Sequence, residues 1–268
     1  MSKASYVYRQ DHIPKNTPCN RRPALNLEAD TITIHNNGNP TSTAANERAW
    51  LTNPTNNRVA SYQIAIDAIE AVEVLPLNEV GWHAGDGSGA KSGNRTSIGI
   101  EICERDVKLG EYAQTLNNAV HLVARLLHDR GWGVDRLRRH YDWSRKNCPR
   151  IMNDDGKWTG WYQFVQRVQV ALQAYDKSLV NVVVNGSPLA EKGMLMNNLT
   201  YVPLRVIGEA IGAKIGWDQK NKEASLDGAV IDGIVISGTT YVPLRLLGDT
   251  IGAKVIWHQP TNTATLTK

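Results

Sequence analysis

The last third of the chain is duplicated, and this duplication limits the folds open to it more than any other feature. Residues 197–226 and 237–266 align at an offset of 40 with 15 identities in 30 positions. Within each copy, apolar residues at helical spacing follow a proline suited to a first helical turn, which predicts short helices over 204–211 and 244–251. Each such helix has one apolar face to bury, so we expect the two copies to pair.

Short strands are expected around these two helices, because the flanking stretches alternate apolar and polar residues. Gly212 and Gly252 stand where each helix should end. The predicted strands span 179–186, 213–218, 223–226, 229–236, 253–258 and 263–266. Each copy is therefore predicted to be a small α+β unit.

The core TYVPLR…G…GAK…W of each copy resembles the copper amine oxidase N-terminal-like repeat of surface and wall-associated proteins in Gram-positive bacteria. The repeats contain a single histidine, His258, and no cysteine, so they offer no copper site. The resemblance implies a wall-targeting module, and a dimerisation or spacer unit is the alternative. Trp217 and Trp257 occupy equivalent positions, where their rings would either stack on sugar or anchor the core of each repeat.

The length of the chain suggests two domains, since 268 residues are nearly two ordinary domains of roughly 150 residues each. We expect one domain over 1–176 and a second over 177–268, with copies at about 178–227 and 228–268. Apolar residues make up 41% and charged residues 21%, a composition typical of globular proteins rather than disordered ones. No run approaches the roughly 18 apolar residues of a membrane span. The opening residues lack the apolar centre of a secretory signal, so we expect synthesis in the cytosol and no membrane insertion.

Charge and cysteine content narrow the function classes further. The net charge of +4 is small, and only 136–150 gathers basic residues, which favours a solvated helix end with site-lining residues over a nucleic-acid surface. No nucleic-acid partner is therefore expected. Three cysteines are an odd number and imply no disulfide framework. Cys19 and Cys103 are expected to be buried or free thiols.

The remaining segment, before the duplication, alternates predicted strands and helices. A buried strand within 29–40 ends at His35, one or two strands lie within 61–77, and another lies within 96–105. This last strand carries Glu101 in its apolar middle, where an unpaired carboxylate would cost several kcal/mol. Amphipathic helices are predicted over 113–130, ended by Gly131, and over 159–175.

Three of the polar side chains form a competent zinc set when taken together. His35, His140 and Cys148 supply two imidazoles and one thiolate, which leaves a fourth zinc position for water, as in catalytic sites. Glu101 would then be the general base, and Lys146 could stabilise an oxyanion. Taken singly, the same residues are open to blander interpretations: a structural histidine, a buried thiol, or one half of an ion pair.

Five ordered motifs in this segment resemble the zinc-dependent N-acetylmuramoyl-L-alanine amidases related to the phage T7 lysozyme and the peptidoglycan recognition proteins. They are ITIHNNG, YQIAID, GWHAGDGSG, GNRTSIGIEIC and H-YDWSRKNCP, and they cover nearly all of 30–150. The resemblance implies an α/β fold with a mixed central sheet flanked by helices. It implies one Zn²⁺ bound by His35, His140 and Cys148, with Glu101 and Lys146 as catalytic residues. It also implies that His83, Asn36 and Asn94 contact substrate, although the glycine-rich stretches around the last of these are equally consistent with a plain loop.

The implied reaction is hydrolysis of the amide between N-acetylmuramic acid and L-alanine by zinc-activated water. A wall hydrolase without a leader resembles a phage endolysin, which stays in the host cytoplasm until lysis and then acts on peptidoglycan of a Gram-positive wall. A bacterial autolysin of the same activity is one alternative, and a non-catalytic peptidoglycan-binding module is another. The oligomeric state stays open, with a dimer through the C-terminal repeats as one option.

Overall fold

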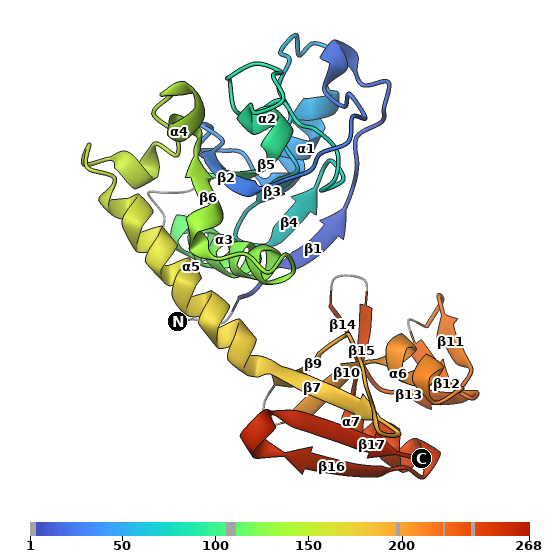
Figure 1. Ribbon diagram of the computed structural model, residues 1–268. Coiled ribbons are helices and arrows are strands. Elements are labelled where there is room, and N and C mark those ends of the chain that lie inside the picture. Colours follow the sequence, from blue (N-terminus) through green and yellow to red (C-terminus); the bar gives the residue numbers. More distant parts are fainter. Residues whose placement is uncertain (1–3, 106–110, 197–198, 222, 237–238) are drawn as a thin grey trace. The chain divides into compact units, whose positions relative to one another are not determined.

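The computed structural model describes residues 4–105, 111–196, 199–221, 223–236 and 239–268. The chain divides into two compact units, 1–173 and 174–268 (Figure 1). Each unit is built around hydrophobic clusters of its own. Within these ranges no helix has both the length and the apolar character that a membrane crossing requires.

A six-stranded mixed sheet forms the centre of the N-terminal unit, in the order β1-β4-β3-β5-β2-β6. The strands are β1 (Val7–Gln10), β2 (Thr31–Asn36), β3 (Ile64–Ile66), β4 (Glu70–Glu73), β5 (Ser97–Ile102) and β6 (Leu137–Arg139). Strands β3, β5, β2 and β6 are mutually parallel, whereas β4 pairs antiparallel with β3 and parallel with β1. The expected mixed sheet is confirmed, and 61–77 forms two strands rather than one.

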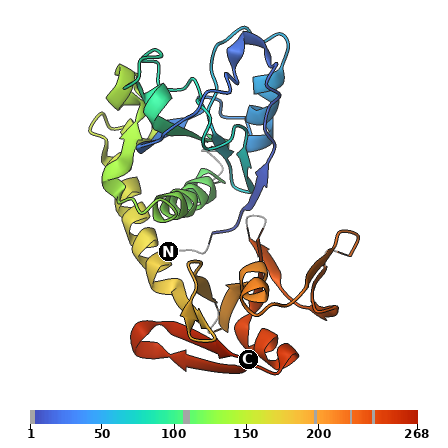
Figure 2. The same ribbon diagram turned by 45° about the vertical axis from the view of Figure 1, so that its right-hand side comes forward.

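Helices cover both faces of this sheet (Figures 1 and 2). They are α1 (Ala44–Thr52), α2 (Gly93–Thr96), α3 (Glu111–His128), α4 (His140–Ser144) and α5 (Thr159–Ser178). The larger hydrophobic cluster joins the sheet to α3 and α5, and a smaller one joins the opposite face to α1. Both predicted helices are confirmed, and Gly131 follows α3 with a positive φ of 64°, which suits a helix end.

The alternation of side chains along β2 and β5 decides which face carries chemistry. Isoleucines at every second position of both strands pack into the larger cluster. The intervening residues therefore point to the other face. In the parallel register, His35 lies directly opposite Glu101 at the carboxyl ends of the two strands. The strands thus place an imidazole and a carboxylate side by side on a polar face of the sheet.

The C-terminal unit contains β7 (Leu179–Val184), β8 (Ser187–Pro188), β9 (Gly193–Met196), β10 (Leu199–Pro203), β11 (Ile215–Asp218), β12 (Glu223–Leu226), β13 (Ala229–Ile231), β14 (Ile234–Ile236), β15 (Thr239–Pro243), β16 (Lys254–His258) and β17 (Thr263–Thr267), with helices α6 (Leu204–Ala210) and α7 (Leu244–Ile251). The two copies pair through the antiparallel strands β10 and β15, and each helix contacts the strand of the other copy. Each predicted segment contains a strand, and 229–236 forms two, β13 and β14, whereas β8, β9, β10 and β15 were not expected. Strands β10 and β15 each end in a proline at the N-cap position of the following helix, so the proline precedes the first turn and does not lie in it.

Candidate metal centre

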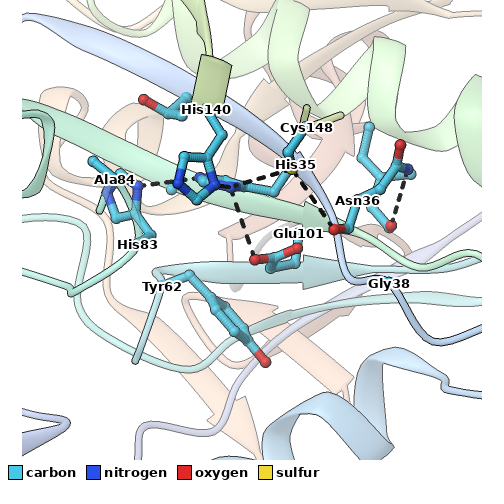
Figure 3. A network of polar contacts seen from close by, with 12 residues as sticks. His35, Asn36, Gly38, Tyr62, His83, Ala84, Glu101, His140 and Cys148 are labelled. Atoms are coloured by element: carbon cyan, nitrogen blue, oxygen red, sulfur yellow. Dashed lines mark hydrogen bonds and ion pairs between the residues drawn. The ribbon is translucent and has the colours of Figure 1, made fainter. Parts of the chain in front are cut away.

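His35, His140 and Cys148 come together at one end of the N-terminal sheet. His35 lies near the end of β2, and His140 follows β6, the neighbouring parallel strand. Cys148 returns to them from the loop after α4, where its backbone N–H donates to the Lys146 carbonyl over 2.7 Å. One ligand atom from each residue lies within 4.8 Å of the other two (Figure 3).

The donor set suits zinc. The Nδ1 atoms of His35 and His140 are 3.0 Å apart, and Cys148 Sγ lies 3.8 Å from His35 Nδ1. All three side chains are buried. Two imidazoles and one thiolate are a set that binds Zn²⁺ tetrahedrally and leaves its fourth position open, so these residues could hold a catalytic zinc ion.

Burial keeps the imidazoles of this cluster neutral. It lowers the pKa of His35 well below its usual value, and the nearby charges of His83, His140 and Lys146 lower it further. Burial likewise lowers the pKa of His83 and of His140 to about 4. At neutral pH these rings therefore carry nitrogen lone pairs, which are what a metal ion requires.

Glu101 lies beside the three ligands. Its Oε1 is 4.0 Å from His35 Nδ1, and its side chain is 14% exposed. Its Oε2 is buried and has no hydrogen-bond partner among the described residues. Burial, reinforced by the carboxylate of Glu47, raises the pKa of Glu101 to about 8, and the Lys146 charge opposes this rise. In the ionised form of Glu101, this orphaned oxygen is a proton acceptor without a structural use.

Lys146 is exposed in the loop that carries Cys148. Its positive charge lowers the pKa of both His35 and His140, so it lies close enough to act on charge at the cluster. Its catalytic role stays a prediction.

The three residues expected to contact substrate are buried. Asn36 donates to the Tyr112 hydroxyl over 3.1 Å and accepts from the Ile151 backbone N–H. Asn94 accepts from the backbone N–H groups of His83 and Ala84, and donates to a backbone carbonyl. His83 Nδ1 lies 3.1 Å from His35 Nε2. Because their polar atoms are used inside the protein, substrate contact by these residues stays a prediction.

Two residues of the site were missed from the sequence. The Tyr62 hydroxyl donates to the buried carboxylate of Glu47 over 3.0 Å, and the tyrosine ring lies near Glu101 (Figure 3). Tyr62 begins the motif YQIAID, and its place in that motif is the signal that could have found it. Glu47 lies on α1, a helix whose buried face mixes a carboxylate with Ala44 and Leu51, so apolar periodicity gave no signal for it.

The two tryptophans singled out in the repeats are surface residues. Trp217 on β11 is 44% exposed and Trp257 on β16 is 40% exposed, which argues against the alternative that they anchor the repeat cores. Trp257 lines a cavity of about 440 Å³ together with Arg245, Ile256 and Gln259.

Comparison with known proteins agrees with both halves of the sequence interpretation. Residues 25–151 match the family model described as N-acetylmuramoyl-L-alanine amidase. Residues 183–232 and 229–268 each match the copper amine oxidase N-terminal domain, which confirms the resemblance of the repeats.

Two curated relatives of the first half, both from Bacillus subtilis (strain 168), illustrate the match. The N-acetylmuramoyl-L-alanine amidase XlyB is 43% identical over 132 residues, which cover 49% of this chain and 40% of the relative. The N-acetylmuramoyl-L-alanine amidase CwlA is 39% identical over 153 residues, which cover 57% of this chain and 52% of the relative. The chain thus spans about half the length of the curated relatives it matches.

A solved structure extends the match to three dimensions. The catalytic domain of XlyA is 37% identical, with a TM-score of 0.53, and the alignment covers 60% of this chain and 98% of that domain. XlyA is itself named an N-acetylmuramoyl-L-alanine amidase. With nearly all of that catalytic domain matched in sequence and fold, the chain belongs to the N-acetylmuramoyl-L-alanine amidase family.

Proposed function

We propose that the N-terminal unit hydrolyses the amide between N-acetylmuramic acid and L-alanine in peptidoglycan, with one Zn²⁺ held by His35, His140 and Cys148. The observation that carries this proposal is the convergence of the three ligand atoms beside the orphaned oxygen of Glu101. A purely structural zinc site would be closed by a fourth protein ligand. Here a carboxylate lies next to three ligands instead.

Zinc, when bound, supplies a Lewis acid that acidifies water and polarises a carbonyl group. Glu101 is assigned the proton transfers that accompany the attack of water. Its Oε2 is buried beside the ligands, so it can accept the proton of the attacking water and pass it to the departing amine of L-alanine. The adjacent strand fixes the distance between this carboxylate and His35, since the two residues are direct neighbours in the register of β2 and β5.

Lys146 supplies positive charge at the site. Its ammonium group already acts on the imidazoles of His35 and His140. The amide oxygen becomes negative as water attacks, and a fixed cation near that oxygen lowers the barrier. We therefore assign oxyanion stabilisation to Lys146.

The C-terminal unit is proposed to hold the enzyme on a Gram-positive wall. The support is its match to a repeat family together with the exposed rings of Trp217 and Trp257, which present flat apolar faces to solvent. We further propose that the protein is a phage or prophage endolysin, retained in the host cytoplasm until lysis. A bacterial autolysin of the same activity is the alternative.

Mass spectrometry of digested walls tests the activity. The zinc-loaded full chain is incubated with purified Gram-positive walls, and Cys148→Ser serves as the matched control. The expected products are a free amine on L-alanine and a free lactyl carboxyl on N-acetylmuramic acid, both absent with the variant. Cleavage at another bond would overturn the proposal, and binding to walls without any cleavage would favour a recognition module instead.

A further inference from the structure

His35 Nδ1 faces the other two ligands, and the second ring nitrogen of His35, Nε2, is also engaged. His35 Nε2 lies 3.1 Å from Nδ1 of His83, and the two rings meet edge to face. The second nitrogen of His83, Nε2, lies 3.0 Å from the backbone carbonyl oxygen of Ser97. A chain of two hydrogen bonds therefore runs from strand β5 through His83 to His35.

The carbonyl group of Ser97, at one end of this chain of hydrogen bonds, determines which atom is the donor in each bond. A carbonyl oxygen only accepts hydrogen bonds, so His83 must donate from Nε2. A neutral imidazole carries a single N–H, which leaves His83 Nδ1 as an acceptor. The proton between the two rings must then belong to His35 Nε2. His35 Nδ1 is left with its lone pair, and this is the atom that faces His140 and Cys148.

We propose that His83 is a positioning residue of the metal site, which fixes His35 in the tautomer whose Nδ1 is free to bind a metal ion. This inference rests on the proposed function in taking zinc as that metal. Metal-binding histidines commonly donate their second N–H to a carboxylate, a backbone carbonyl or water. In this chain a second histidine, itself anchored to a carbonyl, takes that place.

The surroundings of His83 are built to hold its ring in this position. The ring lies against Gly99 on β5, where an added Cβ would approach His83 Cγ and Cδ2 to 2.7 and 2.8 Å. Only glycine leaves room for the ring there. Asn94 Oδ1 also accepts from the backbone N–H groups of His83 and Ala84, over 2.6 and 2.8 Å. The buried side chain of Asn94 thus has a clear use in fixing this segment.

The same segment also orients the second imidazole ligand. His140 hydrogen-bonds the backbone of Ala84, the residue next to His83 (Figure 3). Because His140 Nδ1 faces His35, the nitrogen left for that bond is Nε2. The short segment 83–84 therefore holds both imidazoles with Nδ1 toward the centre. The motif GWHAG therefore contacts the ring nitrogens of the two imidazoles that point away from the converging ligand atoms.

The first test uses the metal-free full chain labelled with ¹⁵N-histidine. Long-range ¹H–¹⁵N spectra near neutral pH report which nitrogen of His35 carries the proton. We expect Nε2–H in the wild type and a mixture of both tautomers in His83→Phe. A wild-type His35 protonated on Nδ1 would falsify the inference, whatever the enzyme cleaves.

The second test measures affinity for Zn²⁺ by competition with a chelator. His83→Phe keeps a flat ring but has no acceptor, and it should bind zinc about 10–100-fold more weakly. His83→Asn places an amide oxygen near the position of Nδ1 and should recover most of that loss. His258→Phe, an exposed histidine of the C-terminal unit, is the matched control and should bind zinc like the wild type.

The outcomes separate this inference from the proposed function. Equal zinc affinity in the wild type and a folded His83→Phe overturns the role of His83 and leaves the amidase proposal intact. A wild type that binds no zinc overturns the zinc-dependent function, and the tautomer spectrum then decides the inference alone. If His83→Phe does not fold, as judged by circular dichroism, the wild-type spectrum and the affinity of His83→Asn decide it.

Discussion

The two units of this chain bury different kinds of side chain. Among the residues that the structure describes, every buried polar or charged side chain lies between Thr17 and His140, in the N-terminal unit. The buried cluster of the C-terminal unit consists of valine, leucine, isoleucine and alanine alone. Its tryptophans lie on the surface instead. One unit thus holds its polar groups inside, and the other shows its aromatic groups outside.

This contrast has a physical consequence for how each unit is specified. A buried polar group is tolerated only with its partner, and removing the partner costs about 1–3 kcal/mol. The N-terminal interior is therefore fixed by particular pairs, such as Asn94 with the backbone of His83, and Glu104 with Arg150. An aliphatic core depends on volume and shape, and it tolerates exchange among similar residues. The two units should accordingly fail in different ways.

Removing the metal should have the largest effect on activity and stability, and it should affect the N-terminal unit only. A chelator is expected to abolish wall hydrolysis and to lower the thermal transition of the N-terminal unit. A ligand present at about 100 times its Kd contributes about 2.7 kcal/mol to stability, and that contribution is lost on removal. Calorimetry with and without chelator checks this, with turbidity of wall suspensions as the activity assay. The contrast between the units breaks if the C-terminal transition shifts as well.

Glu101→Gln should have the next largest effect. The amide cannot accept the proton that the carboxylate accepts, so kcat should fall about 10²–10⁴-fold. Bound zinc, measured by metal analysis, should be unchanged because Glu101 is not among the three converging ligands. Glu223→Gln, at an exposed position of β12, is the matched control and should leave kcat unchanged. Hydrolysis that survives in Glu101→Gln would remove the assignment of the base.

The features of this molecule that depend on local sequence patterns could be predicted. His35 at a strand end and Glu101 inside an apolar strand stand out locally, because each is a titratable side chain at an alternate position of a strand whose other positions are isoleucines. The strands within 29–40 and 96–105 were therefore predictable, and so was the candidate ligand set. The expected repeat helices also follow from local apolar spacing.

Other features depend on contacts between distant parts of the chain. The position of His83 behind His35 joins residues 48 apart in sequence, and no local pattern signals it. Glu47 lies on a helix whose buried face has little apolar periodicity. Strands β10 and β15 end in prolines that also suit a helix start, so the local pattern signals the helices and not the strands before them. Their pairing with each other across the two copies supplies the missing constraint.

A cavity in the aliphatic core should have a smaller effect, confined to the C-terminal unit. Ile207 on α6 is fully buried, and Ile207→Ala should destabilise that unit by about 2–5 kcal/mol. Hydrolysis of a soluble muropeptide should be unchanged, since that unit carries none of the converging ligands. Leu246→Ala, at an exposed position of α7, is the control and should cost much less. Loss of muropeptide hydrolysis in Ile207→Ala would show that the units are not independent.

The smallest effect on stability should come from the exposed aromatic rings, where the function of the C-terminal unit is tested. Trp257 is 40% exposed and lines the cavity of about 440 Å³, so Trp257→Ala should change the free energy of unfolding by about 0.5 kcal/mol or less. Wall binding should fall by about fivefold or more, since a tryptophan at a binding surface commonly contributes more than 1 kcal/mol. Trp217, the equivalent ring, already donates to Gln219 within its own copy, so Trp217→Ala should weaken binding less. Sedimentation of each variant with purified walls measures this difference. Undiminished binding in both variants would mean that the exposed rings do not target the wall, and the spacer or dimerisation role would then account for the repeats.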